Sequence, residues 1–203
     1  MLRATRLVVG AMAVLFGGVA LAQPPKDAST EYFPLKPKTK WTYKVQDQNV
    51  EVTVTGTEKF NNEDCAKVET TVNGKVVASE LYVVRADGVY RVKVKDDKID
   101  PPVKVLALPV KKDASWEVKS KVGNNQTVAG TFKIKNDKEP VEVPAGKFEA
   151  VLVEGVDLDV AGTKTTVRLW LVKDKGIVKL SYKIGEAESV LELKDFSAPA
   201  AAG

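Results

Sequence analysis

Apolar and polar side chains alternate with a period of two over most of the chain. Trp41, Tyr43 and Val45 share one phase, while Thr42 and Lys44 occupy the other. A period of two places alternate side chains on opposite faces of a β-strand, so the pattern predicts strands with one buried and one wet face. The phases predicted to be buried are Trp41, Tyr43 and Val45; Val50, Val52 and Val54; Tyr90, Val92 and Val94; Trp116, Val118 and Val122; Phe132 and Ile134.

Turn residues divide these segments at short intervals. Asn73-Gly74 is the strongest hairpin signal, because a type I′ turn needs positive φ at both central residues, and Asp87-Gly88 predicts a second such turn. Pro144-Ala145-Gly146 suits a type I turn. Further reversals are predicted at Gly123-Asn124-Asn125, Ala161-Gly162 and Lys175-Gly176. About a dozen strands at this spacing predict an all-β fold, an antiparallel meander that forms a strongly curved sheet, an open barrel or a sandwich.

The first 22 residues have the pattern of a secretory signal peptide. Arg3 and Arg6 precede an apolar run, Leu7–Leu21, and Ala20-Leu21-Ala22 predicts cleavage between Ala22 and Gln23. A membrane anchor is the rival interpretation, but the run falls short of the ~20 residues that a spanning helix needs. Gln23 takes the place that a lipoprotein gives to cysteine, which excludes that lipid anchor. We therefore expect a periplasmic or secreted protein with no membrane span after signal removal.

The remaining chain divides into three parts by composition. Residues 23–30 lack periodicity and predict a flexible segment, residues 31–197 predict a single β domain, and residues 198–203 predict a disordered tail. The formal net charge of the 203 residues is +4, to which Arg3 and Arg6 contribute two, and basic and acidic residues are interleaved elsewhere. A nucleic-acid binder concentrates its lysines and arginines on one face, so this balance argues against nucleic acid as a partner.

The amino-acid composition gives little indication of a catalytic site. The chain contains no histidine, which removes Ser-His-Asp and Cys-His catalysis and most transition-metal sites. Asp157 and Asp159 share a strand phase that we expect to face water rather than to form a glycosidase pair. The cluster from Asp96 to Asp100 lacks the spacing of a calcium loop and predicts a polar turn. We therefore expect no catalytic residue, no metal and no cofactor, and predict that the protein is not an enzyme.

Three other features admit a structural and a functional interpretation. Cys65, the single cysteine, cannot form an internal disulfide and predicts a tolerated small residue rather than a reactive thiol. Trp41, Trp116 and Trp170 could form a stacking platform for a ligand, but their strand positions favour core packing. Asn125-Gln126-Thr127 matches an N-glycosylation tripeptide, a pattern that arises often by chance.

Three stretches are apolar on both phases: Leu81–Val84, Val151–Val153 and Leu169–Val172. Strands of this kind are covered on both faces. They are either central strands of a filled structure, or strands whose inner face lines an apolar cavity for a lipophilic ligand.

Two motifs resemble those of a known group of proteins. Tyr32-Phe33-Pro34-Leu35-Lys36-Pro37, followed by Lys40-Trp41-Thr42-Tyr43, resembles the "YFPL…W-Y" opening of exported bacterial proteins of unknown function. Val143–Val151 resembles their "VPAG-F" hairpin, and Lys173–Lys179 resembles their "GVGLVK" segment except at Asp174 and Lys175. The resemblance implies a periplasmic β protein, similar to the curved sheets of lipoprotein carriers, and it implies no active site.

These observations favour two hypotheses for the function of the protein. The first is a non-enzymatic exported β protein that binds a lipophilic molecule or an envelope protein, which predicts an internal cavity above roughly 300 Å³. The alternative is a structural or interaction module of the cell envelope, which predicts a filled core, no ligand, and an exposed edge strand or apolar patch. A hydrolase that uses carboxylates alone ranks last, because it needs two acids converging in one cleft. The ligand-binding residues and the oligomeric state stay unknown at this stage.

Overall fold

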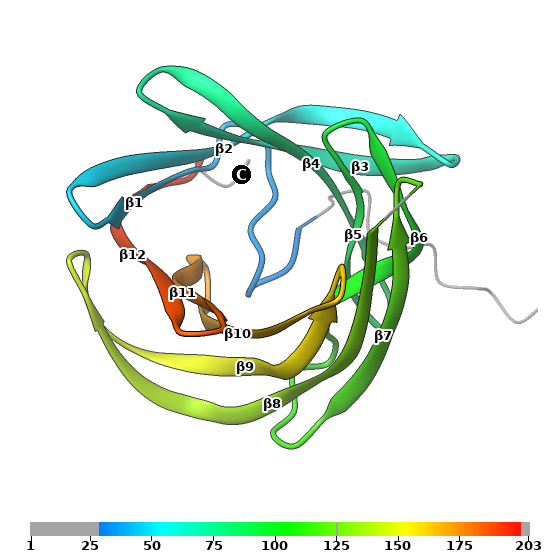
Figure 1. Cartoon of the computed structure of the whole chain (residues 1–203). Coiled ribbons are helices and arrows are strands. Elements are labelled where there is room, and N and C mark those ends of the chain that lie inside the picture. The colour runs from blue at the N-terminus through cyan, green and yellow to red at the C-terminus, as the bar shows by residue number, and fades with distance from the viewer. Residues whose placement is uncertain (1–28, 125, 200–203) are drawn as a thin grey trace, which may run out of the picture.

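Twelve antiparallel strands close into one barrel in this computed structural model, which describes residues 29–124 and 126–199 (Figure 1). Each strand pairs with the next along the chain, and β12 pairs with β1 to complete the ring. The strands are β1 Lys40–Val45, β2 Gln48–Phe60, β3 Glu63–Val72, β4 Lys75–Arg85, β5 Gly88–Val94, β6 Asp97–Ala107, β7 Ser115–Val122, β8 Gln126–Val143, β9 Gly146–Val160, β10 Thr163–Val172, β11 Gly176–Ile184 and β12 Ala187–Ser197. The predicted all-β antiparallel meander is confirmed. The sheet closes into a complete barrel, whereas the sequence analysis considered a curved sheet, an open barrel or a sandwich.

Several predictions fall on residues outside the described ranges. They are the signal peptide 1–22 with its cleavage between Ala22 and Gln23, most of the flexible segment 23–30, and Asn125 of the glycosylation tripeptide. Four residues of the tail, 200–203, also lie outside. Each of these stays a prediction.

The turn chemistry accounts for the hairpins. Asn73 and Gly74 both have positive φ, 50° and 74°, and join β3 to β4 as predicted. The type I′ prediction for Asp87-Gly88 is wrong, because neither residue has a positive φ and Gly88 already pairs with Arg85. Ala86 and Asp87 form the turn instead. Gly88 is required for another reason, since a Cβ there would lie 2.5 Å from the carbonyl oxygen of Leu106.

The two ends of the barrel differ. The hairpins that follow β1, β3, β5, β7, β9 and β11 lie at one end, which we call the open end. The hairpins that follow β2, β4, β6 and β10 lie with both ends of the described chain at the opposite, closed end, whereas the β8–β9 hairpin packs along β12, where the backbone N–H of Ala145 donates to the carbonyl of Leu193 at 2.9 Å. At the closed end, the segment of residues 29–39 before β1 loops across the interior of the ring, where Figure 1 shows it in blue. Phe33 and Leu35 of this segment are buried in the core.

One side of the interior is solid and the other is looser. Inward side chains of β5 to β9 are almost completely buried, among them Val89, Leu106, Ile134 and Val153. Across the ring, several inward side chains of β2, β11 and β12 are only half-buried: Val50, Val52, Leu180 and Leu191. The space they leave is where a site can form.

A bulge in β5 makes the predicted buried phase of Tyr90, Val92 and Val94 wrong in part. Tyr82 pairs with Arg91, whereas the preceding Leu81 pairs with Lys93, so β5 carries one extra residue at Val92. The extra residue shifts the inward phase along β5. Arg91, predicted to face water, therefore lies on the same face as Tyr82. Val92 instead packs with Cys65, Leu81 and Val83 in a small cluster separate from the main core.

Candidate functional site

An apolar cavity lies in the looser side of the barrel. Its walls come from β1 to β4 and from β11 and β12, and its floor is formed by Phe33, Pro34 and Leu35. Trp41 and Tyr43 of β1 line it, as do Leu180 and Leu191, which face each other from β11 and β12. The register explains this set, because Trp41 pairs with Val52 and Val52 pairs with Thr70, so all three lie on the same inner face.

The cavity measures about 170 Å³. This is smaller than the roughly 300 Å³ expected of a barrel that encloses a whole lipophilic ligand. The expectation of a preformed carrier cavity of that size is therefore wrong, because the floor segment fills space that an empty barrel would leave. A volume of this order still accommodates a small ring, since a 150 Å³ apolar cavity can bind benzene.

The floor is tied to the barrel wall on two sides. The ring of Phe33 contacts that of Tyr82 in β4, with 5.5 Å between the centroids. On the far side, Glu31 accepts a backbone hydrogen bond from Asp174 at 2.6 Å, and its carboxylate pairs with Lys173 at 2.8 Å. Pro34 packs against Gly176, where a Cβ would lie 3.0 Å from the proline ring. The segment is thus a built part of the barrel.

Two aromatic side chains of the wall have their polar atoms satisfied. The Nε1 of Trp41 donates to the carbonyl of Lys175 at 2.6 Å, and the hydroxyl of Tyr43 donates to the carbonyl of Ile177 at 2.7 Å. Burial raises the pKa of Tyr43, so this hydroxyl stays protonated. These bonds connect β1 to the chain around the start of β11 and leave the rings as apolar surface.

One polar group interrupts this apolar wall. Glu80 of β4 accepts a hydrogen bond from Nη1 of Arg91 at 2.8 Å and another from the hydroxyl of Tyr82 at 3.0 Å. Burial, reinforced by the neighbouring carboxylate of Glu80, raises the pKa of Tyr82 and keeps its proton in place as a donor. The Nε of Arg91 is buried without a hydrogen-bond partner. Glu80 and Tyr82 line the cavity, and Arg91 supports Glu80 from beside it.

The sequence analysis missed this polar group. Glu80 directly precedes the apolar stretch Leu81–Val84 and shares the phase of Tyr82, which could have placed its carboxylate on the inner face. Arg91 could not be placed without knowledge of the bulge. The structure therefore brings together two charged residues that no sequence motif connects.

The three doubly apolar stretches have different surroundings. In Leu81–Val84, Tyr82 lies on the cavity side, while Leu81 and Val83 are buried in the small cluster with Cys65. Val151 and Val153 are buried in the main core, as are Leu169 and Leu171. Of these three stretches, only the first contributes a residue to the cavity wall. The prediction that such strands are covered on both faces is confirmed for Leu81–Val84.

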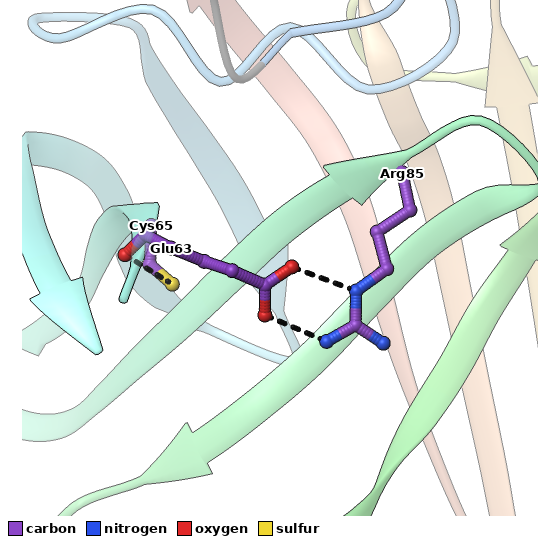
Figure 2. Close-up of polar contacts among 3 residues, drawn as sticks. All are labelled: Glu63, Cys65 and Arg85. Atoms are coloured by element: carbon purple, nitrogen blue, oxygen red, sulfur yellow. Dashed lines mark hydrogen bonds and ion pairs between the residues drawn. The ribbon is translucent and has the colours of Figure 1, made fainter. Parts of the chain in front are cut away.

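Cys65 is buried and has no disulfide partner. Its Sγ lies 3.7 Å from the carbonyl oxygen of Glu63, and Figure 2 shows the carboxylate of Glu63 reaching from β3 to the guanidinium of Arg85 on β4. That ion pair is bidentate, with N···O distances of 2.9 and 2.7 Å. Burial raises the pKa of Cys65 to about 11, and the nearby Glu63 contributes in the same direction. These surroundings support the interpretation of Cys65 as a structural residue.

The three tryptophans do not gather at one site. Trp41 lines the cavity, Trp116 stacks on Phe132 at 5.9 Å, and Trp170 lies beneath the ammonium of Lys179. Each therefore packs within its own part of the barrel. The stacking platform considered from the sequence is not formed.

The acidic candidates take part in local contacts. Asp157 is exposed, and Asp159 accepts a hydrogen bond from the backbone of Gly162 at 2.9 Å, which stabilises the turn between β9 and β10. Asp100 pairs with Lys98 at 2.9 Å. Two larger hollows, of about 450 and 430 Å³, lie among charged side chains on the outer faces of β2 to β5 and of β1, β11 and β12. None of these places combines enclosure with an apolar lining.

Comparisons with known proteins show a similarity of fold and no similarity of sequence to a known family. No family model matches the chain, and no curated protein matches it. A solved structure from Parabacteroides distasonis, described as a lipoprotein, superposes with a TM-score of 0.54 at 13% identity, covering 83% of this chain and 99% of its own. A second, described as an exported protein with a YmcC-like fold from Bacteroides fragilis, gives 0.51 at 12% identity, covering 79% and 94%.

The fold is therefore shared with exported bacterial proteins. At these identities the likeness shows the fold alone. It agrees with the resemblance drawn from the "YFPL…W-Y" and "VPAG-F" motifs to the extent that both lead to exported proteins, while the family itself stays a prediction. Across the described residues, no helix is long and apolar enough to cross a membrane.

Proposed function

We propose that this protein is a non-enzymatic, exported binding protein whose barrel takes the small apolar part of an amphipathic molecule. The observation that carries the proposal is the cavity of about 170 Å³ in the looser side of the barrel, lined mainly by aromatic and aliphatic side chains, with the carboxylate of Glu80 and the hydroxyl of Thr70 as its small polar groups. Ligand sites of proteins have this composition, a mostly apolar lining with few polar groups that fix orientation. The volume restricts the occupant to a ring or a short chain, so the carrier of a whole enclosed lipid is abandoned.

The position of the cavity agrees with a role in binding. It lies between the floor segment and the half-buried inner faces of β2, β11 and β12. The opposite side of the barrel is solid, and its buried side chains hold the wall in place. A site on such a scaffold needs little rearrangement to admit a ligand.

Titration of the ¹⁵N-labelled protein with benzyl alcohol tests the proposal. We expect chemical-shift changes at the backbone of Trp41, Tyr82 and Leu180, which line the cavity, and none at Ile134 in the solid side. Trp41→Phe keeps an aromatic ring at this position but removes part of the apolar wall and the hydrogen bond from Nε1 to Lys175, so it should weaken binding. Saturable changes elsewhere on the barrel, or no changes at all, would contradict the proposal.

The alternative is an envelope module with no ligand. A specific feature favours it: the large apolar side chains that are most exposed, Val76, Val77, Val156, Tyr182 and Ile184, all lie near turns of the open end. The closed ring leaves no edge strand among the described residues, which removes the other feature this hypothesis predicted. Native mass spectrometry of protein purified from its own envelope separates the cases, since a small ligand, a bound protein and an empty chain give different masses.

A further inference from the structure

The cavity has one charged side chain on its wall, that of Glu80. Glu80 lies opposite Val68 of β3, on the inner face of β4, and its side chain retains 19% exposure. The guanidinium of Arg91 neutralises this carboxylate at 2.8 Å. The polar end of the cavity is thus a carboxylate whose charge is already balanced.

The donor groups of the three aromatic side chains Trp41, Tyr43 and Tyr82 in the cavity wall are already used. The Nε1 of Trp41 donates to Lys175, the hydroxyl of Tyr43 donates to Ile177, and the hydroxyl of Tyr82 donates to Glu80. Each carboxylate oxygen of Glu80 accepts one hydrogen bond within the protein, although a carboxylate offers about four acceptor positions. Apart from the hydroxyl of Thr70, the side chains of the lining therefore offer a ligand hydrogen-bond acceptors rather than donors, and the unpartnered Nε of Arg91 belongs to a residue that does not line the cavity.

A charged head group would be unfavourable here. An anionic ligand would lose its hydration and find the guanidinium of Arg91 already paired with Glu80. A cationic ligand would lose its hydration and find a carboxylate already paired with Arg91. An uncharged hydroxyl or amide can donate to Glu80 without either cost.

Resting on the function proposed above, we infer that the ligand is an uncharged amphipathic molecule with a hydrogen-bond donor, such as an alcohol or primary amide, at its polar end. Glu80 is the residue that sets this preference, by accepting from the head group. Tyr82 and Arg91 are positioning residues that hold the carboxylate in place.

Four probes with one ring separate the possibilities: toluene, benzyl alcohol, benzylamine and benzoate, each titrated at pH 7 into the ¹⁵N-labelled protein. We expect benzyl alcohol to bind at least about tenfold more tightly than benzoate and benzylamine, the size of effect that one unfavourable charge contributes. If no probe binds, the proposed function fails. If toluene binds as tightly as benzyl alcohol, or if a charged probe binds as tightly, the function stands and the inference about Glu80 is overturned.

Two variants assign the preference to Glu80. Glu80→Gln replaces one acceptor oxygen by a donor group of the same shape, so the preference for benzyl alcohol over benzoate should narrow or reverse. Glu154→Gln, the matched control, makes the same change at a partly buried carboxylate of β9 that is paired with Arg168 at 2.8 Å and does not line the cavity, so it should leave the preference unchanged. If Glu80→Gln does not fold, the four probes on the unaltered protein still decide the question. An unchanged preference in folded Glu80→Gln would contradict the inference.

Discussion

At the scale of single residues, Cys65 illustrates how burial removes reactivity. The thiol is fully buried beneath Leu81 and Val92, and the bidentate pair of Glu63 with Arg85 lies next to it (Figure 2). The thiolate is the reactive species of a cysteine, and a pKa raised to about 11 keeps the thiol protonated at neutral pH. Reaction therefore requires the cluster to open.

We predict that a thiol-specific disulfide reagent labels Cys65 at pH 8 at least about a hundredfold more slowly in the native protein than in urea, because labelling must wait for local opening. Absorbance of the released thiolate measures both rates. Glu63→Gln breaks the ion pair beside the cluster and should accelerate native labelling, whereas Lys147→Ala, which alters an exposed ion pair elsewhere, should not. Rapid stoichiometric labelling of the native protein would contradict the buried position.

At the scale of elements, the floor segment determines the size of the cavity. Phe33 and Leu35 are buried at 8% and 2% exposure, and they fill the end of a ring that the strands alone would leave open. The backbone reinforces this position, since Leu35 donates to the hydroxyl of Ser29 and Lys38 donates to the carbonyl of Val54. The segment therefore contributes to stability and limits the ligand at the same time.

Phe33→Ala should lower the free energy of unfolding by about 3 kcal/mol, because a large buried ring is lost and the site collapses only in part. Urea denaturation measures this change. The enlarged cavity should also admit 2-naphthalenemethanol, a probe with one ring more than benzyl alcohol. The control is Lys36→Ala, whose exposed side chain should affect neither property. Full stability of Phe33→Ala would show that the segment is not part of the core.

Sequence patterns predicted the elements better than the site. The turn at Asn73-Gly74 and the buried positions Val118, Ile134 and Trp41 follow from local chemistry, which alternation and turn propensity express directly. Arg91 was misplaced because a single extra residue in β5 reverses the phase, and the pattern carries no mark of it. The cavity could not be predicted from the sequence, because it depends on the closure of the ring and on the position of the floor segment.

At the scale of the whole molecule, the closed ring has no first or last strand. The chain could therefore begin at another hairpin and still form the same ring. Lys40 at the start of β1 pairs with Ser197 at the end of β12, so the two ends of the ring are neighbours. The hairpin between β3 and β4 is a two-residue turn, and Asn73, Gly74 and the following Lys75 are all exposed. Breaking the chain there changes few buried contacts.

A circular permutant that joins the ends by a flexible linker and opens between Asn73 and Gly74 should therefore fold, with the far-ultraviolet spectrum of the parent and a modest loss of stability. A permutant opened at Ile134, a fully buried core residue of β8, should fail to give a cooperative unfolding transition. Equal behaviour of the two permutants would contradict the described ring.

Both ends of the described chain lie at the closed end. The exposed apolar side chains lie near the turns of the opposite, open end. If the chain is tethered through either terminus to a surface, a sensor chip or a fused partner, the turns of the open end point outward into solution. A lipophilic molecule arriving from that side would meet no obstruction from the tether.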